Sequence, residues 1–348
     1  MKIAIHHSPG SFSERWIDYC KEHKIDYKLV NAYDSDIVKQ VDDCDAFMWH
    51  HHHADYRDAL FAKQLLYSLQ LAGKKVFPDF NTGWHFDDKV GQKYLFEAIG
   101  APLVSSYVFY TKQEAMHWVK ETSFPKVFKL RGGAGAANVK LARTRKEAVR
   151  LINKAFGKGF SQFDRWGYLK ERFHKWRAGS NSFVGVLKGM GRLVIPTEFA
   201  RFHAPEKGYV YFQEFIPNDG FDIRVLVVGK YAVALQRNVR KGDFRASGSG
   251  NLVFPNENID KQYIRLAFEI SVIMNSQSMA VDLIKDKKGK INVVEVSYGF
   301  PMFNFLDKSS GFWTSDLVWH EGKFIPQYWM IENLISRISI PSAISLSQ

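Results

Sequence analysis

Two acidic residues near the end of the sequence lie in short apolar stretches, Asp282 in AVDLI and Glu295 in VVEVS. A turn over 286–289 would join these stretches as a β-hairpin in which Asp282 faces Val293. Because side chains alternate along a strand, Asp282, Glu295 and Ser297 would share one face, with the two acids as diagonal neighbours roughly 7–8 Å apart at Cα. Proteins commonly hold Mg²⁺ with one or two carboxylates and phosphate oxygens. The spacing predicts a metal site, with two solvent-facing acids as the alternative.

A lysine precedes a glycine-rich segment in the middle of the chain. Lys129 lies in the apolar stretch PKVFKL, and the segment after it contains Gly132, Gly133 and Gly135. Backbone N–H groups of such a segment can close over phosphates, and a lysine beside it adds a positive charge. The residue order of a P-loop is absent here. Taken alone, this segment favours an ordinary connecting loop, with a phosphate contact as the alternative.

The stretch YVYFQEFIPNDGFDIRVLVVG contains the residues that could bind a nucleoside. A strand end that is largely apolar and has exposed backbone can grip the edge of an adenine ring, and a nearby carboxylate can accept hydrogen bonds from ribose hydroxyls. The strand-end residues are Gln213, Glu214, Phe215 and Ile216, and the carboxylate is Asp222.

Three arginines follow within a short distance in the sequence. Arg224 and Arg237 alternate with apolar residues on two predicted strands that a tight turn joins, and Arg245 lies in the loop GDFRASGSGN. A guanidinium in a polar cleft can bind phosphate or carboxylate with two hydrogen bonds. Each arginine alone could instead form a surface ion pair. The prediction of an anion-binding cleft therefore rests on the convergence of all three beside the predicted metal site.

The hydrophobic pattern predicts an α/β protein in which these residues are held by strand ends and hairpins. Up to about residue 82, short apolar strands alternate with helical stretches, which is typical of a parallel sheet. From residue 209 the pattern is mainly β. Capping-box spacings predict helices that begin after Thr111 and Thr144. The predicted N-terminal strands are 3–5, 27–30, 46–49 and 75–77, and the later ones are 126–130, 138–142, 209–216, 223–228, 231–239, 279–284 and 290–297.

Composition is consistent with a globular cytoplasmic protein of 348 residues. The chain is 46% hydrophobic and 24% charged, contains two cysteines, and has neither a membrane-spanning apolar run nor a signal-peptide pattern at its start. Its formal net charge of +12 favours anionic partners such as a nucleotide, an acidic sugar, nucleic acid or a membrane surface. A solvated lysine-rich surface would explain the charge equally well.

Taken in order, these motifs resemble the ATP-grasp superfamily, most closely the branch with the ribosomal-protein glutamate ligase and bacterial glutathione synthetase. The resemblance spans about residues 88–301, and the chain departs from it at Ser297, where the family has a metal-binding asparagine. A softer resemblance, carried by GGAGAANVKLA, EVSYGF and LVWHEGKF, is to ATP-grasp proteins found among bacterial surface-polysaccharide genes. The matching motifs are Asp88-Lys89, Lys129 with 132–138, QEFI with Asp222 and Arg224, Arg237, Phe244-Arg245, Asp282 and Glu295.

The resemblance implies an ATP-grasp fold in three parts. These are an N-terminal parallel α/β domain at 1–86, a central lid domain at 87–208, and a C-terminal antiparallel-sheet domain at 209–348 that carries the metal site. ATP and Mg²⁺ are the implied cofactors. In the implied roles, phosphates contact Lys89, Lys129 and the glycines; adenine contacts Gln213, Glu214, Phe215 and Ile216; ribose contacts Asp222; Arg224, Arg237 and Arg245 stabilise the transferring phosphoryl group; and Asp282, Glu295 and, less tightly, Ser297 hold the metal.

The implied activity is ATP-dependent ligation of a carboxylate to an amine through an acyl phosphate. The softer resemblance implies a sugar carboxylate or amino sugar joined with an amino acid, in polysaccharide modification. Alternatives are a kinase on the same fold and, because of Ser297, a non-catalytic nucleotide-binding protein. A nucleic-acid binder is disfavoured because the arginines lie among nucleotide motifs and form no separate stripe.

Four questions stay open at the level of sequence. The histidines 50–53 follow a predicted strand at the sheet edge where ligands bind, but consecutive residues cannot all face one metal. The basic aromatic insertion at 158–207 fits a lid helix or a stacking surface. The substrates are not identified, and neither is the oligomeric state, for which a homo-oligomer is one option.

Overall fold

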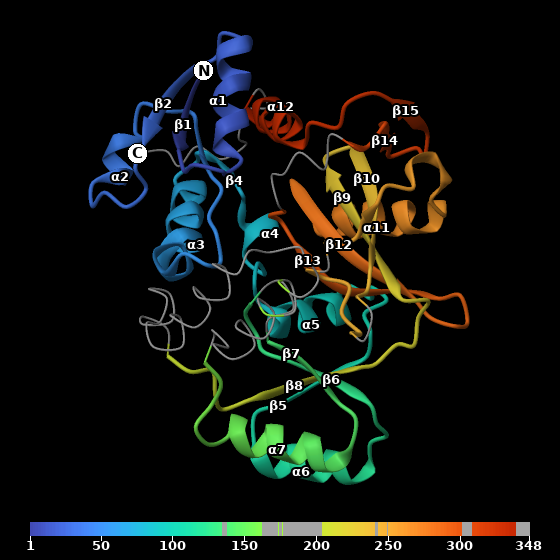
Figure 1. Ribbon diagram of the computed structural model, residues 1–348. Helices are drawn as coiled ribbons and strands as arrows, with labels where there is room; N and C mark the ends of the chain where they lie inside the picture. Colours follow the sequence, from blue (N-terminus) through green and yellow to red (C-terminus); the bar gives the residue numbers. More distant parts are fainter. Residues whose placement is uncertain are drawn as a thin grey trace.

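The computed structural model describes residues 1–133, 138–161, 173, 176, 204–240, 243–248, 250–300 and 308–338. In these ranges the chain forms three sheets with helices packed against them, so the predicted α/β class is confirmed (Figure 1). The predicted site residue Gly135 and most of the insertion 158–207 lie outside the described residues. None of the helices in the described ranges is long and apolar enough to cross a membrane.

The first unit is a parallel four-stranded sheet in the order β2-β1-β3-β4. Strands β1 and β3 are buried because helices cover both sheet faces. On one face Ile3 and Ile5 pack in a core with Trp16 of α1, and on the other Ala4 packs in a core with Leu66 of α3. The elements are β1 (Lys2–His6), α1 (Ser13–Glu22), β2 (Asp26–Val30), α2 (Ile37–Gln40), β3 (Ala46–Trp49), α3 (Tyr56–Leu71), β4 (Lys75–Phe77) and α4 (Phe80–Gly83).

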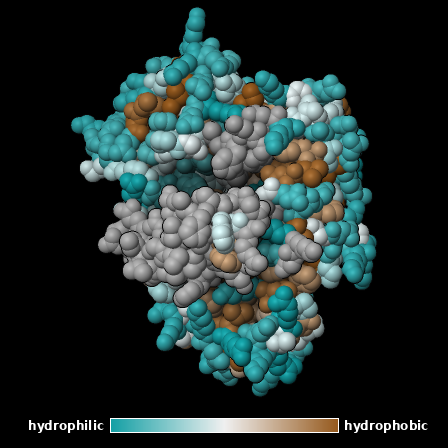
Figure 2. Space-filling model, viewed as in Figure 1, coloured by the Kyte–Doolittle hydropathy of each residue, from teal (hydrophilic) through white to brown (hydrophobic). Residues whose placement is uncertain are grey.

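The second unit, here called the lid unit, is an antiparallel four-stranded sheet in the order β5-β8-β6-β7. Helices α6 and α7 lie side by side on one face of it (Figure 1), and hydrophilic side chains predominate on their outer surface (Figure 2). Both predicted caps are confirmed, because the side chains of Thr111 and Thr144 accept hydrogen bonds from Glu114 N and Glu147 N. The elements are β5 (Ser106–Phe109), α6 (Lys112–Glu121), β6 (Lys126–Lys129), β7 (Val139–Ala142), α7 (Arg145–Ala155) and β8 (Val210–Glu214).

The third unit is an antiparallel sheet in the order β13-β12-β9-β10-β14-β15, with β11 beside β10. Helix α11 covers one face, and α12 lies on the other, where it also packs against α1 and β4. Helix α5 packs against β13. The elements are α5 (Lys89–Ala98), β9 (Phe221–Val228), β10 (Tyr231–Asn238), β11 (Leu252–Val253), η1 (Asn256–Asn258), α11 (Lys261–Ile273), β12 (Ser278–Lys285), β13 (Ile291–Ser297), β14 (Gly311–Thr314), β15 (Trp319–Glu321) and α12 (Pro326–Ile338).

The register of the β12–β13 hairpin differs from the prediction. Asp282 lies directly opposite Glu295 and not opposite Val293. The turn is one residue longer than predicted, so Leu283 faces Val293, and a β-bulge then adds Val294 before the next pair. Because a bulge sets two residues of one strand against one of its partner, it turns a predicted diagonal pair of acids into a direct cross-strand pair.

Buried polar contacts attach the first unit to the third sheet. The Gln277 side chain, just before β12, accepts from Asp79 N at 2.9 Å and donates to Val76 O at 2.9 Å. The Tyr298 hydroxyl, just after β13, donates to His51 O at 2.6 Å. The ends of β3 and β4 are therefore fixed to the strands that carry the acidic pair. The domain boundaries at residues 86 and 208 stay a prediction.

Candidate functional site

A pocket lies between the lid sheet and the third sheet, with the start of α5 in its wall. Of the predicted site residues, Gly132, Arg224 and Ser297 do not line this pocket, and Gly135 is outside the described residues. The predicted residues that do line it are Lys89, Lys129, Gly133, Gln213, Glu214, Phe215, Ile216, Asp222, Arg237, Arg245, Asp282 and Glu295. The fold thus gathers residues that are more than 200 positions apart in the sequence.

The acidic pair of the hairpin meets two of the predicted arginines. Arg224 donates to both carboxylate oxygens of Asp282, from Nε at 2.6 Å and from a terminal nitrogen at 2.8 Å. Arg237 lies 2.8 Å from Asp282 as well, and it donates twice to Asp222 at 2.7 Å. Cross-strand register explains this network, because Asp282 faces Arg224 and Asp222 faces Arg237. In this structure Asp222, the predicted ribose contact, is bound to an arginine.

The protonation of this cluster follows from burial opposed by ion pairing. Burial would raise the pKa of the Asp282 carboxyl, but Arg224 and Arg237 outweigh burial and hold that pKa well below its usual range. Burial likewise opposes ionisation of Glu295, yet the Lys89 and Lys129 ammonium groups lower its pKa. Both acids are therefore carboxylates at neutral pH, and the pocket floor carries two negative charges between positive ones.

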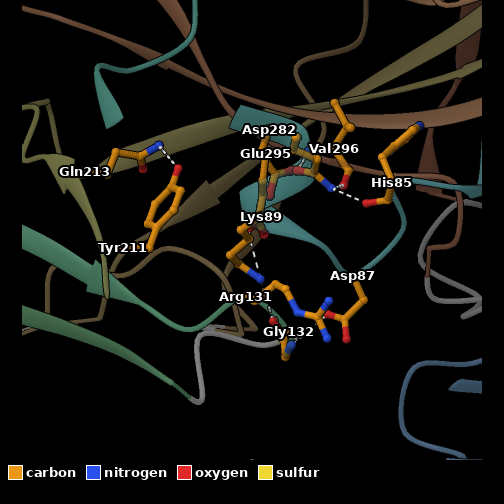
Figure 3. A network of polar contacts seen from close by, with 12 residues as sticks. His85, Asp87, Lys89, Arg131, Gly132, Tyr211, Gln213, Asp282, Glu295 and Val296 are labelled. Atoms are coloured by element: carbon orange, nitrogen blue, oxygen red, sulfur yellow. Dashed lines mark hydrogen bonds and ion pairs between the residues drawn. The ribbon is translucent and has the colours of Figure 1, made fainter. Parts of the chain in front are cut away.

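The two predicted phosphate lysines occupy different environments. Lys89 Nζ donates to Gly133 O at 2.8 Å and lies 3.7 Å from Glu295 (Figure 3). Lys129 is 5% exposed, and its Nζ has no hydrogen-bond or ion-pair partner in the described part of the chain. Burial lowers the pKa of Lys129 to about 8, against the opposing field of Glu295. Lys129 is thus a buried cation that faces the pocket and that an anionic ligand could pair.

The predicted adenine end lies at the junction of β8 with the loop after it. The Glu214 carboxylate accepts from Lys126 Nζ at 2.7 and 2.8 Å and from the Tyr107 hydroxyl at 3.0 Å. Gln213 is buried, and its amide donates to Ser106 Oγ at 3.1 Å. Sequence reasoning missed Lys126, because a lysine in an apolar strand gives no signal until its partner on the neighbouring strand is known.

Helix α5 is fixed to β13 by a residue that sequence reasoning also missed. The Gln92 amide donates to His85 O at 3.0 Å and to Val296 O at 2.8 Å, and its oxygen accepts from Val296 N at 3.1 Å. Gln92 follows Lys89 by three positions and so shares its helix face, a spacing from which it could have been found. These bonds hold Lys89 beside Glu295.

Ser297, Arg245 and the histidines 50–53 have contacts of their own away from the acidic pair. The Ser297 hydroxyl donates to Gly299 O at 2.6 Å. Arg245 lines the pocket and donates to Asp243 at 2.8 to 3.2 Å. The histidines 50–53 follow β3, where the His50 ring stacks on Phe12 at 3.7 Å, and none of the four lines the pocket.

The donor set of the hairpin fits one Mg²⁺. Asp282 and Glu295 present hard oxygen donors from directly opposed strand positions, and two carboxylates with phosphate oxygens suffice for this ion. Within the described ranges no three His, Cys, Asp or Glu side chains gather as a metal site made of protein ligands alone. The arrangement is therefore one in which a phosphate-bearing ligand would have to complete the coordination.

Comparison with known proteins gives the same fold over nearly the whole chain. Residues 202–310 match the family described as RimK-like ATP-grasp domain. The structure of a RimK domain ATP-grasp protein from Sphaerobacter thermophilus is 15% identical, covering 97% of this chain and 100% of that one at a TM-score of 0.56. The ATP-grasp ligase PsnB in complex with precursor peptide PsnA2 and AMPPNP is 10% identical, covering 97% and 98% at 0.53.

A second group of structural neighbours contains carboxylases. The biotin carboxylase domain of the Hydrogenobacter thermophilus 2-oxoglutarate carboxylase, in complex with MgADP, ADP and bicarbonate, is 14% identical, covering 100% of this chain and 71% of that one at a TM-score of 0.59. No curated protein sequence matches the chain. At these identities the neighbours share a fold with this protein, and their ligands and reactions are their own.

Proposed function

From the match of residues 202–310 to the RimK-like ATP-grasp domain and from the fold shared with ATP-grasp proteins, we propose that this chain is an ATP-dependent ligase that joins a carboxylate to an amine through an acyl phosphate. The observation that carries the proposal is a pocket that combines the opposed carboxylates Asp282 and Glu295 with Lys129, a cation that no described residue pairs. A buried ammonium without a partner is costly unless an anion binds it. A triphosphate with a divalent cation would satisfy both halves of this arrangement.

In the proposed complex the nucleotide lies along the pocket. Phe215 and Ile216 would pack against adenine, with Gln213 and Glu214 beside them, and Asp222 would face the ribose. At the other end Lys89 and Lys129 would bind the phosphates beside Gly133, and Asp282 and Glu295 would hold Mg²⁺. The ion, when bound, would neutralise phosphate charge as it shifts during transfer.

The proposed reaction has two steps that balance. A substrate carboxylate oxygen attacks the γ-phosphorus, the bond from that phosphorus to ADP breaks, and an acyl phosphate forms. An amine then attacks the acyl carbon, inorganic phosphate leaves, and the amine gives up a proton as the amide forms. Arg237 and Arg245 line the pocket and would stabilise charge on the transferring group, with Arg224 acting through Asp282.

The finer proposal concerns the substrates and rests on the sequence resemblance to proteins of surface-polysaccharide genes. It assigns a sugar carboxylate or an amino sugar, joined with an amino acid, as the reactants of a cytoplasmic enzyme. One solved neighbour, PsnB, is a ligase seen with a precursor peptide, so a peptide carboxylate belongs in the same screen.

The test is a magnesium-dependent ADP-release assay with pairs of carboxylates and amines, followed by mass spectrometry of the products. We expect ADP, phosphate and an amide in equal amounts, and none of them from the Glu295→Gln variant. Phosphate release without amide would contradict ligation, and a phosphorylated hydroxyl product would identify a kinase. If the wild-type protein binds no ATP by calorimetry, with or without Mg²⁺, the proposed function is wrong.

A second candidate, a nucleotide-binding protein without turnover, is favoured by one contact. The Ser297 hydroxyl is bonded to Gly299 O, away from the pocket, at the position where the related family has a metal-binding asparagine. Under this candidate the Ser297→Asn variant would gain ATP turnover that the wild-type protein lacks. Turnover by the wild-type protein would exclude it.

A further inference from the structure

The base of the glycine-rich loop is gripped by side chains from two other parts of the chain. Three consecutive backbone N–H groups donate to side-chain oxygens, and none of these oxygens belongs to the loop itself. Arg131 N donates to the Tyr209 hydroxyl at 2.6 Å, and Gly132 N donates to Glu206 at 3.3 Å. Gly133 N donates to Asp87 Oδ1 at 2.7 Å. Oxygen acceptors of the protein therefore satisfy the first N–H groups of the loop.

Gly133 is held at both ends of its backbone by one short segment. Asp87 accepts from its N–H group, and Lys89, two residues later, donates from Nζ to its carbonyl at 2.8 Å. The backbone of Lys89 also donates to Arg131 O at 3.0 Å. Figure 3 shows Lys89 between the Asp282–Glu295 pair and the base of the loop. Three hydrogen bonds thus join the start of α5 to the base of the loop.

Asp87 adopts a backbone conformation that is uncommon outside glycine. Its φ of 55° lies in the left-handed region, which non-glycine residues seldom occupy. Its position is maintained from the first unit, because Lys63 Nζ donates to Trp84 O at 2.8 Å and to Phe86 O at 2.7 Å. The backbone at Asp87 is thus kept in an uncommon conformation by contacts from another unit, and its carboxylate accepts from one N–H group. Such a combination indicates a functional constraint.

We infer that Asp87 is a positioning residue for the phosphate tail of the nucleotide, because its carboxylate fixes Gly133 on one side of the tail while Lys129 faces it from the other. This inference rests on the proposed function. Asp87 is not in the pocket lining and acts through Gly133, which is. Removing its acceptor oxygen should therefore weaken binding of a nucleotide with three phosphates far more than binding of AMP, whose adenine and ribose lie at the other end.

Calorimetry with AMP, ADP and AMPPNP in the presence of Mg²⁺ tests the inference on the full chain. Asp87→Ala should weaken AMPPNP binding about tenfold or more, as loss of a hydrogen bond to a charged group commonly does, and leave AMP within about twofold. Asp87→Asn keeps an acceptor for Gly133 N and should stay within about threefold of wild type. Asp260→Ala is the matched control, since Asp260 also accepts from a backbone N–H at a helix start, at 3.0 Å, and lies outside the pocket.

Equal weakening of AMP and AMPPNP by Asp87→Ala would show a merely structural role and overturn the inference. Loss of binding in Asp87→Asn as large as in Asp87→Ala would overturn it as well. Amide hydrogen exchange gives a readout that needs no nucleotide. The exchange rate of the Gly133 amide should rise at least about tenfold in Asp87→Ala and should not change in Asp260→Ala. If wild type binds no nucleotide, the proposed function fails. Unchanged exchange of the Gly133 amide in Asp87→Ala would by itself refute the proposed fixing of Gly133 by Asp87.

Discussion

Replacing Lys129 should make the free protein more stable and the nucleotide complex weaker. Burial lowers the pKa of Lys129 from 10.5 to about 8. The difference is 10.5 − 8 = 2.5 pH units, which corresponds to about 3 kcal/mol of unfolding free energy lost while the ammonium is charged. At pH 7 the Lys129→Met variant should recover up to about 3 kcal/mol, because a methionine of similar length fills the space without a buried charge.

The sign of the pH dependence follows from the direction of this shift. Between pH 8 and 10.5 the unfolded chain binds the Lys129 proton and the folded chain does not, so this lysine makes wild-type stability rise with pH in that window. Below pH 8 both states are protonated and the full penalty applies. Nucleotide affinity should change in the opposite sense, since phosphate binding needs the ammonium form, and should fall toward tenfold per pH unit above about 8.

Urea denaturation and calorimetry with AMPPNP and Mg²⁺ between pH 7 and 9.5 measure the two effects. At pH 8 about half of the Lys129 side chains are neutral, so binding should take up about half a proton, seen as a dependence of the binding enthalpy on the buffer. The Lys129→Arg variant keeps its charge throughout and should show a flat affinity. A wild-type affinity that stays constant to pH 9.5, or a Lys129→Met variant no more stable than wild type at pH 7, would refute the reasoning.

Two further substitutions test contacts that place the site. Asp282→Asn leaves the guanidiniums of Arg224 and Arg237 without their shared carboxylate. We expect urea denaturation to show that the unfolding free energy falls by roughly 3–5 kcal/mol. A loss below about 1 kcal/mol would contradict a stabilising role of these buried ion pairs. Tyr298→Phe removes the hydroxyl that donates to His51 O, and it should cost about 1–3 kcal/mol in the same measurement; an unchanged midpoint would show that this bond does not fix the first unit to β13.

Much of the local structure could be predicted from sequence because local interactions decide it. Thr111 and Thr144 begin helices because their side chains accept the N–H group three residues on, and that acceptor is visible in the sequence. The strands β12 and β13 follow from two short, mainly apolar runs on either side of a turn. The order of motifs from Lys89 to Glu295 likewise indicated the fold that the neighbours share.

Register and long-range partners were decided only by the tertiary structure. A turn one residue longer and a bulge at Val294 bring Asp282 opposite Glu295, and no residue type at these positions specifies that count. Lys126 and Asp87 gave no signal, because the partner of each lies on another element, Glu214 on β8 for Lys126 and Gly133 at the base of the glycine-rich loop for Asp87. The sequence by itself determined which chemical groups are present and the elements that carry them. The distances between those groups depend on packing among segments far apart in the chain, which no local pattern encodes.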